Sequence, residues 1–509
     1  MGNPGLVVLR PGNAVARSAL QPLAFGDFRH TIVNAPATGR RIVALFGHTP
    51  SADGPVELYA VLADAAQGLL HVGRTTLDSD RFPSLTPDCP QVHLFERELA
   101  EQYGVRPEGH PWLKPVRFHA SYRPHRDAWG RKPSAVPTVG VMDFFRVDGE
   151  EIHEVAVGPI HAGVIEPGHF RFQCHGEHVF HLEISLGYQH RGVESALVGG
   201  PGRRTMHMME AAAGDTTIGH ALAHCEVMEA LGASRVPIRA QVLRGVALEL
   251  ERLANHTGDL GALAGDVAYL PTAAYCGRIR GDFLNLTALL CGSRFGRCML
   301  RPGGVGFDLD EPRKLRFLVR LEAAYRDLNV AVALLWDSAS VQARFEGTGT
   351  VSAEVGFALG LVGPAARASG IEYDVRREFP SGIFRFSQVP VSTWQTGDVF
   401  ARAYVRWLEI QRSVAFIRTQ LQEFPTGPIR ADVASARPDH LAVALVEGWR
   451  GAICHVALTD ARGRFARYKI VDPSFYNWTG LAMAVRDAEI SDFPLCNKSF
   501  NLSYCGHDL

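Results

Sequence analysis

No C-x-x-C pair occurs in this 509-residue sequence, although it contains nine cysteines. The two that lie closest along the chain are Cys291 and Cys298. Structural zinc and iron–sulfur sites are usually built from closely spaced cysteine pairs. The spacing therefore argues against such sites and predicts reduced, buried thiols. The remaining cysteines are Cys89, Cys174, Cys225, Cys276, Cys454, Cys496 and Cys505.

The chain also has little net charge and no long apolar segment. A formal net charge of −1 gives no reason to expect binding to nucleic acid or to an anionic membrane surface. The apolar run NVAVALLW at 329–336 is far shorter than the ~18 residues of a membrane span. The first twenty residues lack the features of a signal peptide. If the protein works at a membrane, we expect other subunits to hold it there.

Common nucleotide-binding and hydrolase motifs are missing as well. The sequence contains no Walker loop, no G-x-G-x-x-G after a predicted strand and no G-x-S-x-G. No nucleotide-binding site can therefore be identified from motifs. The hydrophobic content of 46% and the charged content of 21% are nevertheless ordinary for a globular protein, so we expect well-packed domains.

The length and the residue pattern predict an α+β fold with more than one domain. Residues 28–118 contain three β-rich runs, at 40–47, 56–64 and 69–77, and an amphipathic helix at 91–104. A segment rich in proline, glycine and charge follows at 121–140 and is typical of a linker. We predict a small domain over 1–120, a linker over 121–150 and a larger domain over 151–509, with separate cores.

The larger domain is predicted to combine a β-sheet with a helix bundle. Short alternating segments separated by turns occupy 157–197, and strands return at 451–460 and 465–471. Apolar residues at helical spacing predict long helices between these regions. A bundle of facing helices is a common place for a buried site. The predicted helices cover 206–232, 239–265, 311–338 and 398–424.

Two clusters of polar residues could carry chemistry. In the segment HAGVIEPGH, His161, Glu166 and His169 lie in a turn fixed by proline and glycine, where they could move protons or simply face solvent. In AAAGDTTIGHALAHC, Asp215, Thr216 or Thr217 is a plausible N-cap of the following helix. His220 and His224 lie one turn apart on that helix, a spacing that binds metal in only a minority of proteins.

A third group lies along one face of the helix predicted over 239–265. Glu249, Arg252, His256 and Asp259 are separated by three or four residues. A solvated stripe of ion pairs is the more frequent explanation for such spacing. The alternative is a polar chain buried in the bundle, in which every member needs a partner.

Several segments together resemble a known family. RFPSLTPDCPQVHLFERELAEQYGVRPEGHP (81–111) resembles the small hydrophilic subunit of respiratory complex I. Other segments resemble the large subunits of energy-converting, formate hydrogenlyase-like NiFe hydrogenases and the related large hydrophilic subunit of complex I. These segments are VGPIHAGVIEPGHFRF, LGYQHRGVESAL, LELERLANHTGDLGALAGD, RPGGV, RYKIVDPSFYNW and DFPLCNKSFNLSYCGHDL. The resemblance covers most of residues 80–509, in the expected order.

The departures from the hydrogenases concern the metal ligands. Two C-x-x-C pairs hold nickel and iron in those proteins. By resemblance, the first pair corresponds to Ala213 and Thr216 here, and the second, which follows Asp-Pro, to Ser474 and Asn477. These side chains cannot replace the soft thiolates that such a centre requires. The resemblance therefore implies a hydrogenase-like pocket without its metal, lined by Asp215, Thr216, Ser474 and Asn477.

The resemblance to complex I implies a second use for this pocket, because complex I binds a quinone headgroup there. In complex I a histidine of the first loop and a tyrosine of the first bundle helix hold the quinone. The loop position corresponds to Glu166, as in hydrogenases, where a glutamate passes protons, and no tyrosine occurs in 211–225. A quinone is thus possible, but its usual ligands are not present.

The resemblance implies an oxidoreductase subunit at the cytoplasmic face of the bacterial inner membrane. We expect this chain to bind no metal cofactor itself and to receive electrons from an iron–sulfur partner subunit. A ferredoxin-like subunit and antiporter-like membrane subunits are the other expected partners, and the complex would join NAD-linked electron transport to ion translocation. Glu166, His161, His169 and His220 are the expected proton-handling residues. The alternatives are a non-catalytic structural subunit and, less favoured, a working NiFe hydrogenase.

Overall fold

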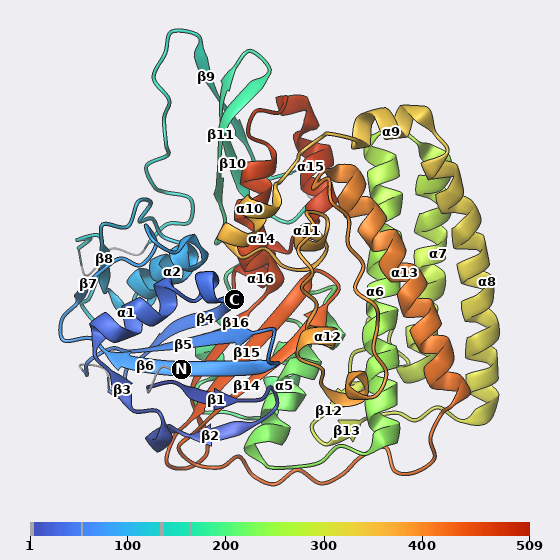
Figure 1. Ribbon diagram of the computed structural model, residues 1–509, viewed down its shortest axis with the longest axis horizontal. Coiled ribbons are helices and arrows are strands. Elements are labelled where there is room, and N and C mark those ends of the chain that lie inside the picture. Colours follow the sequence, from blue (N-terminus) through green and yellow to red (C-terminus); the bar gives the residue numbers. More distant parts are fainter. Residues whose placement is uncertain (1–4, 52–53, 133–136, 162–164) are drawn as a thin grey trace.

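The computed structural model describes residues 5–51, 54–132, 137–161 and 165–509 and has an α+β architecture (Figure 1). A β-rich N-terminal part lies on one side of a central sheet formed largely by the C-terminal strands. A bundle of long helices lies on the other side of this sheet. The fold class predicted from the sequence is confirmed. No helix within the described ranges is long and apolar enough to cross a lipid bilayer.

The N-terminal sheet contains the three predicted β-rich runs as neighbouring antiparallel strands, β4 (Arg40–His48), β5 (Glu57–Asp64) and β6 (Leu69–Thr76). Strand β1 (Val7–Leu9) pairs antiparallel with β6, and β3 (Pro22–Leu23) pairs parallel with it. A second, two-stranded sheet joins β7 (Arg81–Pro83) to β8 (Arg106–Glu108). The helical elements are η1 (Arg17–Ala19), α1 (Phe25–Val33), η2 (Pro36–Thr38), η3 (Pro90–Val92) and α2 (His93–Tyr103).

Helix α2 follows the sequence prediction closely. Its apolar residues Phe95, Leu99 and Tyr103 are buried, and the helix ends at Gly104, whose φ of 65° is a left-handed conformation that favours glycine. The acidic face of α2 is buried too, which the sequence did not suggest. Glu98, for example, accepts hydrogen bonds from Lys469 of the C-terminal sheet. Both faces of the helix are therefore enclosed by the rest of the chain.

The central sheet unites the two ends of the chain. Its order is β16–β15–β14–β2, formed by β16 (Phe465–Val471), β15 (Gly451–Thr459), β14 (His440–Gly448) and β2 (Ala14–Ala16). Alternate residues of β14 point to opposite sides: Leu441, Val443 and Leu445 pack with the N-terminal part, whereas Ala442 and Ala444 pack with the helices. Both faces of this sheet are buried, which explains its nearly continuous apolar sequence.

The prediction of two separate cores is therefore wrong. The apolar residues of the N-terminal part form one cluster with β14 and β15, because the β2–β14 pairing and the shared sheet face join them. The boundaries predicted at 1–120, 121–150 and 151–509 stay a prediction. Within 121–150, the described residues form no helix or strand.

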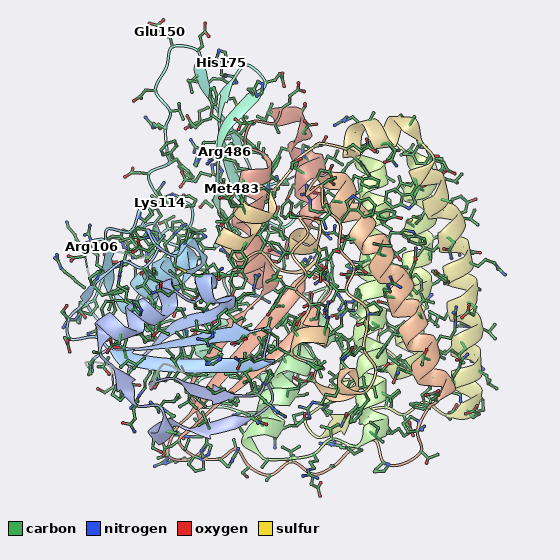
Figure 2. All side chains as sticks on the ribbon, in the orientation of Figure 1. Arg106, Lys114, Glu150, His175, Met483 and Arg486 are labelled. Carbon is green, nitrogen blue, oxygen red and sulfur yellow. The ribbon has the colours of Figure 1, made fainter. Side chains whose placement is uncertain are left out.

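Three strands between residues 152 and 185 form an antiparallel sheet that projects from the body of the molecule (Figure 1). Its order is β11 (His178–Ser185), β10 (His169–His175) and β9 (Ile152–Val157). Strands β10 and β11 match the predicted alternating segments. Figure 2 shows His175 at the outer end of this sheet. Glu150, which precedes β9 in the sequence, lies at the same end. The short helix α3 (Val193–Leu197) follows.

The bundle differs from the prediction in two respects. The helix expected over 206–232 is interrupted, giving α4 (Thr205–Glu210) and α5 (Thr217–Leu231) with a loop between them. All fifteen residues of α5 are buried against the central sheet. The second difference is a long helix that was not predicted, α7 (Leu270–Cys291), which packs closely on α6 (Ile238–Asp266). A Cβ atom added at Gly261 would lie 2.7 Å from the Cβ of Cys276, so glycine permits this approach.

Helices α6, α7, α8 (Glu311–Trp336) and α13 (Val399–Gln422) make up the bundle at the right of Figure 1. The remaining elements are short and connect or cover these layers. They are β12 (Leu300–Arg301), β13 (Gly304–Val305), α9 (Ala339–Phe345), α10 (Ala353–Leu359), α11 (Gly363–Arg367), α12 (Val375–Glu378), η4 (Gly382–Arg385), α14 (Pro473–Ala484), η5 (Ile490–Asp492), α15 (Phe493–Phe500) and α16 (Tyr504–His507).

Candidate functional site

Glu166 lies where the loop before β10 meets the C-terminal segment. One carboxylate oxygen accepts a hydrogen bond from the backbone N–H of Tyr504, and the other accepts one from the side-chain amide of Gln189, both at 3.3 Å. Glu166 is partly exposed. Residues 162–164 of the same predicted loop lie outside the described residues. The structure thus joins Glu166 to a segment more than 300 residues away along the chain.

The two histidines of this loop are held by backbone groups. The Nε2 atom of His161 lies 2.9 Å from the carbonyl oxygen of Gly168, to which an N–H there would donate. The Nδ1 atom of His169 lies 3.1 Å from the carbonyl of Gly158, and Arg171 donates to its Nε2. Burial lowers the pKa of His169. Neither histidine contacts Glu166 directly through these bonds, so the three residues do not form one hydrogen-bonded unit.

The loop between α4 and α5 is built around an ion pair between the buried Arg450 and the partly exposed Asp215. Arg450 donates to both carboxylate oxygens of Asp215, at 2.6 and 2.7 Å. The hydroxyl of Thr216 accepts from the indole N–H of Trp449 at 3.1 Å, and Ala213 is fully buried beside it. Burial tends to raise the pKa of Asp215, but Arg450 more than offsets this and lowers it. The loop therefore holds a carboxylate paired with a guanidinium.

Two arginines join this loop to the C-terminal segment. Arg450 also donates to the carbonyl of Asn501, and Arg191 donates to the carbonyls of residues 211 and 212 and of Cys505. The Gly214 backbone bonds the thiol of Cys505, although burial dominates and raises the pKa of that thiol. The segment that faces residues 211–216 is thus 501–505.

Ser474 and Asn477, which correspond by resemblance to the second cysteine pair of the hydrogenases, lie in two different surroundings. The Ser474 hydroxyl accepts a hydrogen bond from the backbone N–H of Ser503 at 2.9 Å, so Ser474 touches the C-terminal segment. The Asn477 side chain instead bonds both backbone groups of Val362, at 3.1 Å each. Asn477 therefore stabilises a neighbouring loop. The structure brings Asp215 and Thr216 together, but it does not join them directly to Ser474 and Asn477 by hydrogen bonds.

Sequence reasoning did not assign Arg191, Arg450 or residues 501–505 to this loop. A signal was present, because Arg191 lies in LGYQHRGVESAL and residues 501–505 lie in DFPLCNKSFNLSYCGHDL, two of the motifs that carry the family resemblance. Arg450 lies in no such motif, since it acts through a backbone carbonyl and through a carboxylate distant in sequence. The role of the two arginines became visible only when the chain ends and the loop were placed together.

The N-terminus of α5 is capped differently from the prediction. Thr216 occupies the N-cap position, yet its hydroxyl makes no capping bond. The backbone N–H groups of Ile218 and Gly219 donate instead to the carboxylate of Glu251 on α6, at 2.7 and 3.1 Å. Burial raises the pKa of Glu251 to about 8. A side chain from another helix has replaced the local cap, because Thr216 is already engaged by Trp449 and Arg450.

His220 is fully buried in a chain of polar side chains. Its Nε2 lies 3.0 Å from the carboxylate of Asp472, and its Nδ1 lies 3.1 Å from His455. His224, one turn further along α5, contacts Tyr468. Within the part of the chain that the structure describes, no group of three His, Cys, Asp or Glu side chains is placed to hold a metal ion.

A cavity of about 400 Å³ lies next to the loop that carries His161. Its wall is largely apolar and aromatic, with Phe170, Phe172 and Phe493, and Lys498 and Tyr504 supply polar groups. Small-molecule sites typically have this size and this mixture of apolar walls and few polar groups. Because Tyr504 also binds Glu166 through its backbone, the cavity and the carboxylate share one segment.

The polar stripe on α6 is buried, so the solvated arrangement that we expected as the more frequent one is wrong. Glu249, Arg252, His256 and Asp259 are each at most 2% exposed. Arg252 bonds Glu249, and His256 lies 2.7 Å from the carboxylate of Glu409 on α13. The stripe faces the bundle interior and the central sheet, where every charge requires a partner.

A second, larger cavity of about 620 Å³ lies beside α5 and α6. Glu226 lines it and is 8% exposed. The hydroxyl of Ser381 donates to one of its carboxylate oxygens, while the other has no hydrogen-bond partner among the described residues. Burial raises the pKa of Glu226 from 4.5 to about 7.

This raised pKa predicts a pH-dependent stability that Glu226→Gln should remove. The folded state binds the Glu226 proton more tightly than the unfolded chain does, so the associated stability is complete below about pH 4.5 and is lost as the pH rises through 7. Relative to the Gln variant, the parental chain should therefore lose about 2–3 kcal/mol between these limits. Urea unfolding of both chains at several pH values measures this difference. Glu108→Gln, at an exposed ion pair, is the control and should show no such trend.

Comparisons with known proteins identify two parts of this chain. Residues 266–442 match the family described as respiratory-chain NADH dehydrogenase, 49 Kd subunit, and residues 42–131 match the 30 Kd subunit. The carbon monoxide-induced hydrogenase of Rhodospirillum rubrum is 31% identical over 352 residues, covering 69% of this chain and 97% of that protein.

Two further relatives are a formate hydrogenlyase subunit and an NADH-quinone oxidoreductase subunit. Formate hydrogenlyase subunit 5 of Escherichia coli is 26% identical over 449 residues, covering 85% of this chain and 78% of the relative. NADH-quinone oxidoreductase subunit 4 of Thermus thermophilus is 28% identical over 369 residues, covering 67% of this chain and 90% of the relative.

These matches place the chain in the class of oxidoreductase subunits that includes those of complex I and related hydrogenases. Specifically, the chain belongs to the 49 Kd-subunit family of respiratory-chain NADH dehydrogenase, with a 30 Kd-subunit region fused in front of it. Members of this family are subunits of larger complexes. The resemblance stated from the sequence motifs is confirmed at this level.

Proposed function

We propose that this chain is a redox-arm subunit of a complex related to complex I and that it handles protons for the reduction of a quinone-like acceptor. Electrons would come from an iron–sulfur partner subunit, with a ferredoxin-like subunit and antiporter-like membrane subunits in the same assembly. The assembly would lie at the cytoplasmic face of the bacterial inner membrane and couple electron transfer to ion translocation.

The observation that carries this proposal is the composition of the loop facing the C-terminal segment. Nickel and iron require soft thiolate ligands, and Ala213, Thr216, Ser474 and Asn477 offer none. Cys505 is a buried thiol whose pKa is raised, which disfavours the thiolate form. These residues do not fit a NiFe centre, so no step of the proposal involves one.

A quinone headgroup fits the neighbouring cavity better. The aromatic walls offer Phe170 and Phe493 to a flat ring, and Lys498 and Tyr504 are the polar groups that would hold its oxygens. A bound quinone would supply the capacity to accept two electrons and two protons. Glu166 accepts a hydrogen bond from the backbone of Tyr504 and can hold or release a proton next to this cavity. Its side chain would therefore carry protons beside the cavity, whose lining also includes His161.

Exposed apolar side chains beside the loop of His161 support a partner subunit on the side of the chain where the cavity lies. Ile160 is 83% exposed and Ile165 is 50% exposed, and both flank the loop of His161. Large apolar side chains exposed next to a functional loop are typical of surfaces that another subunit covers. We therefore assign the iron–sulfur partner to this side of the chain.

A structural role is the second candidate, and one observation favours it. The Arg450–Asp215 ion pair occupies the loop region, and its bonds rigidify the junction with residues 501–505. A subunit kept for docking would need such a junction and no proton carrier. The two candidates differ in whether titratable residues near the cavity affect turnover.

The native complex, purified through a tag on this chain, tests the proposed function. With reduced methyl viologen as donor, we expect reduction of decylubiquinone, no hydrogen evolution and far less nickel than one atom per chain. The measurements are quinone absorbance, gas chromatography and elemental analysis. Hydrogen evolution together with nearly one nickel per chain would contradict the proposal, and a complex without quinone turnover would favour the structural role.

A further inference from the structure

Five fully buried side chains form a continuous hydrogen-bonded chain between α5, the central sheet and α14. The contacts run from Asp472 to His220 at 3.0 Å, from His220 to His455 at 3.1 Å and from His455 to Tyr468 at 3.0 Å. The last contact joins Tyr468 to His224 at 2.9 Å. None of the five side chains is more than 1% exposed.

With every histidine ring neutral, the chemistry of these groups permits one consistent direction for every hydrogen bond. The Asp472 carboxylate can only accept, so Nε2 of His220 donates to it. The Nδ1 atom of a neutral His220 then accepts from Nε2 of His455, whose own Nδ1 accepts from the Tyr468 hydroxyl. The Tyr468 oxygen finally accepts from Nδ1 of His224, which leaves Nε2 of His224 as the far end.

The surroundings favour the neutral forms of His455, His224 and Tyr468. Burial lowers the pKa of His455 well below its ordinary value, lowers that of His224 to about 4, and raises that of Tyr468 well above its ordinary value. Burial also tends to raise the pKa of Asp472, but its bond to His220 and the charge of Arg450 lower it. When His220 is neutral as well, the Asp472 carboxylate ends a row of neutral donors that all point toward it.

Few other ionisable groups face the chain. At the Asp472 end, Arg450 is the neighbouring cation, and Asp215 shares it. At the Tyr468 end, the neighbouring groups are the buried thiols of Cys225 and Cys454. Burial raises the pKa of both thiols to about 12, so they stay protonated and neutral.

We propose that Asp472, His220, His455, Tyr468 and His224 form a proton relay that connects the sheet interior to the C-terminal segment. The inference rests on the proposed function, and it adds a route for protons that Glu166 alone does not provide. Asp472 is adjacent to that segment: a Cβ atom added at Gly506 would lie 2.7 Å from the Asp472 carboxyl carbon. Gly506 is thus required for the close approach.

The transfer of one proton along the relay balances in atoms and charge, and it needs no oxidant or reductant. A proton binds Nε2 of His224, and the N–H at Nδ1 breaks as an O–H forms on Tyr468. The original Tyr468 proton moves to Nδ1 of His455, whose Nε2 proton moves to Nδ1 of His220. The Nε2 proton of His220 moves to Asp472, which can release it toward the C-terminal segment. Each step breaks one bond to hydrogen and forms one, and the rings end in the opposite tautomers.

Tyr468→Phe interrupts this relay in the middle while keeping an aromatic ring. In the assembled complex we expect quinone turnover to fall at least ~10-fold and its solvent deuterium isotope effect to increase, because a proton-transfer step becomes slower. Tyr476→Phe is the matched control. Tyr476 is also buried, but its hydroxyl donates to the backbone carbonyls of Ile42 and Val43 and lies outside the relay. Equal rates and equal isotope effects in the two variants would overturn the proposal.

A second measurement is independent of turnover. In the chain labelled with ¹⁵N-histidine, NMR should show His220 and His455 as neutral rings protonated at Nε2 and His224 as a neutral ring protonated at Nδ1, with signals assigned by single His→Gln variants. Any other tautomer at His455 would overturn the relay. If the complex shows no quinone turnover, the proposed function fails, and these tautomers then decide whether the relay exists.

Discussion

Glu166→Gln is expected to lower the turnover of the assembled complex by ~10²–10⁴-fold while leaving the complex intact. The Gln side chain has the shape of Glu but cannot take up or release a proton. It keeps one acceptor oxygen for either Gln189 or the backbone of Tyr504, so only one of two long hydrogen bonds at a partly exposed position is lost. Assembly should therefore survive. Quinone reduction by the purified complex measures the effect.

The control for Glu166 is Glu151→Gln in the projecting sheet. Glu151 is paired with His175 at 2.6 Å, Figure 2 shows His175 at the outer end of that sheet, and neither residue lines the cavity. Turnover of this control should equal that of the parental complex. If Glu166→Gln also turned over at the parental rate between about pH 6 and 8, Glu166 would have no proton role and the structural candidate would be the better one.

Glu409→Gln is expected to destabilise the folded chain by about 3–5 kcal/mol. Glu409 on α13 accepts bonds from Arg367 at 2.6 Å and contacts His256 at 2.7 Å, and Arg252 lies 3.5 Å away. Burial tends to raise the pKa of Glu409, but Arg367 and His256 hold it well below its ordinary value. Neutralising this carboxylate removes the anion that two buried guanidinium groups share, leaving Arg252 with Glu249 and Arg367 with Glu447.

Urea unfolding at neutral pH measures this loss. The matched control is Glu322→Gln on α8, where Glu322 accepts two bonds from Arg418 of α13 at the surface. Water and salt screen exposed pairs, so this variant should lose less than ~1 kcal/mol. Similar losses in the two variants would show that burial does not decide the strength of these ion pairs and would contradict our account of the bundle interior.

The local elements of the chain follow from its sequence. Strands β4, β5 and β6 and helix α2 appear where alternation and helical spacing predicted them, because each pattern already matches one face that must be buried. The family could also be identified, since its motifs occur in order along the chain. The periodicity joined 206–232 into one helix, but the N-cap candidates Asp215, Thr216 and Thr217 already indicated a helix start there, and α5 begins after Thr216.

The tertiary structure decided which sides face solvent and which distant residues meet. The stripe of Glu249 and His256 is equally compatible with exposure and with burial, because spacing along a helix is identical in both cases; only the packing of α13 and the central sheet selected burial. Likewise, the family resemblance proposed Ser474 and Asn477 as partners of the 213–216 loop, whereas the chain path brought residues 501–505 there. The spacing of residues in a motif specifies their geometry only within one turn of a helix. Contacts across hundreds of residues depend on how the sheet and the bundle pack together.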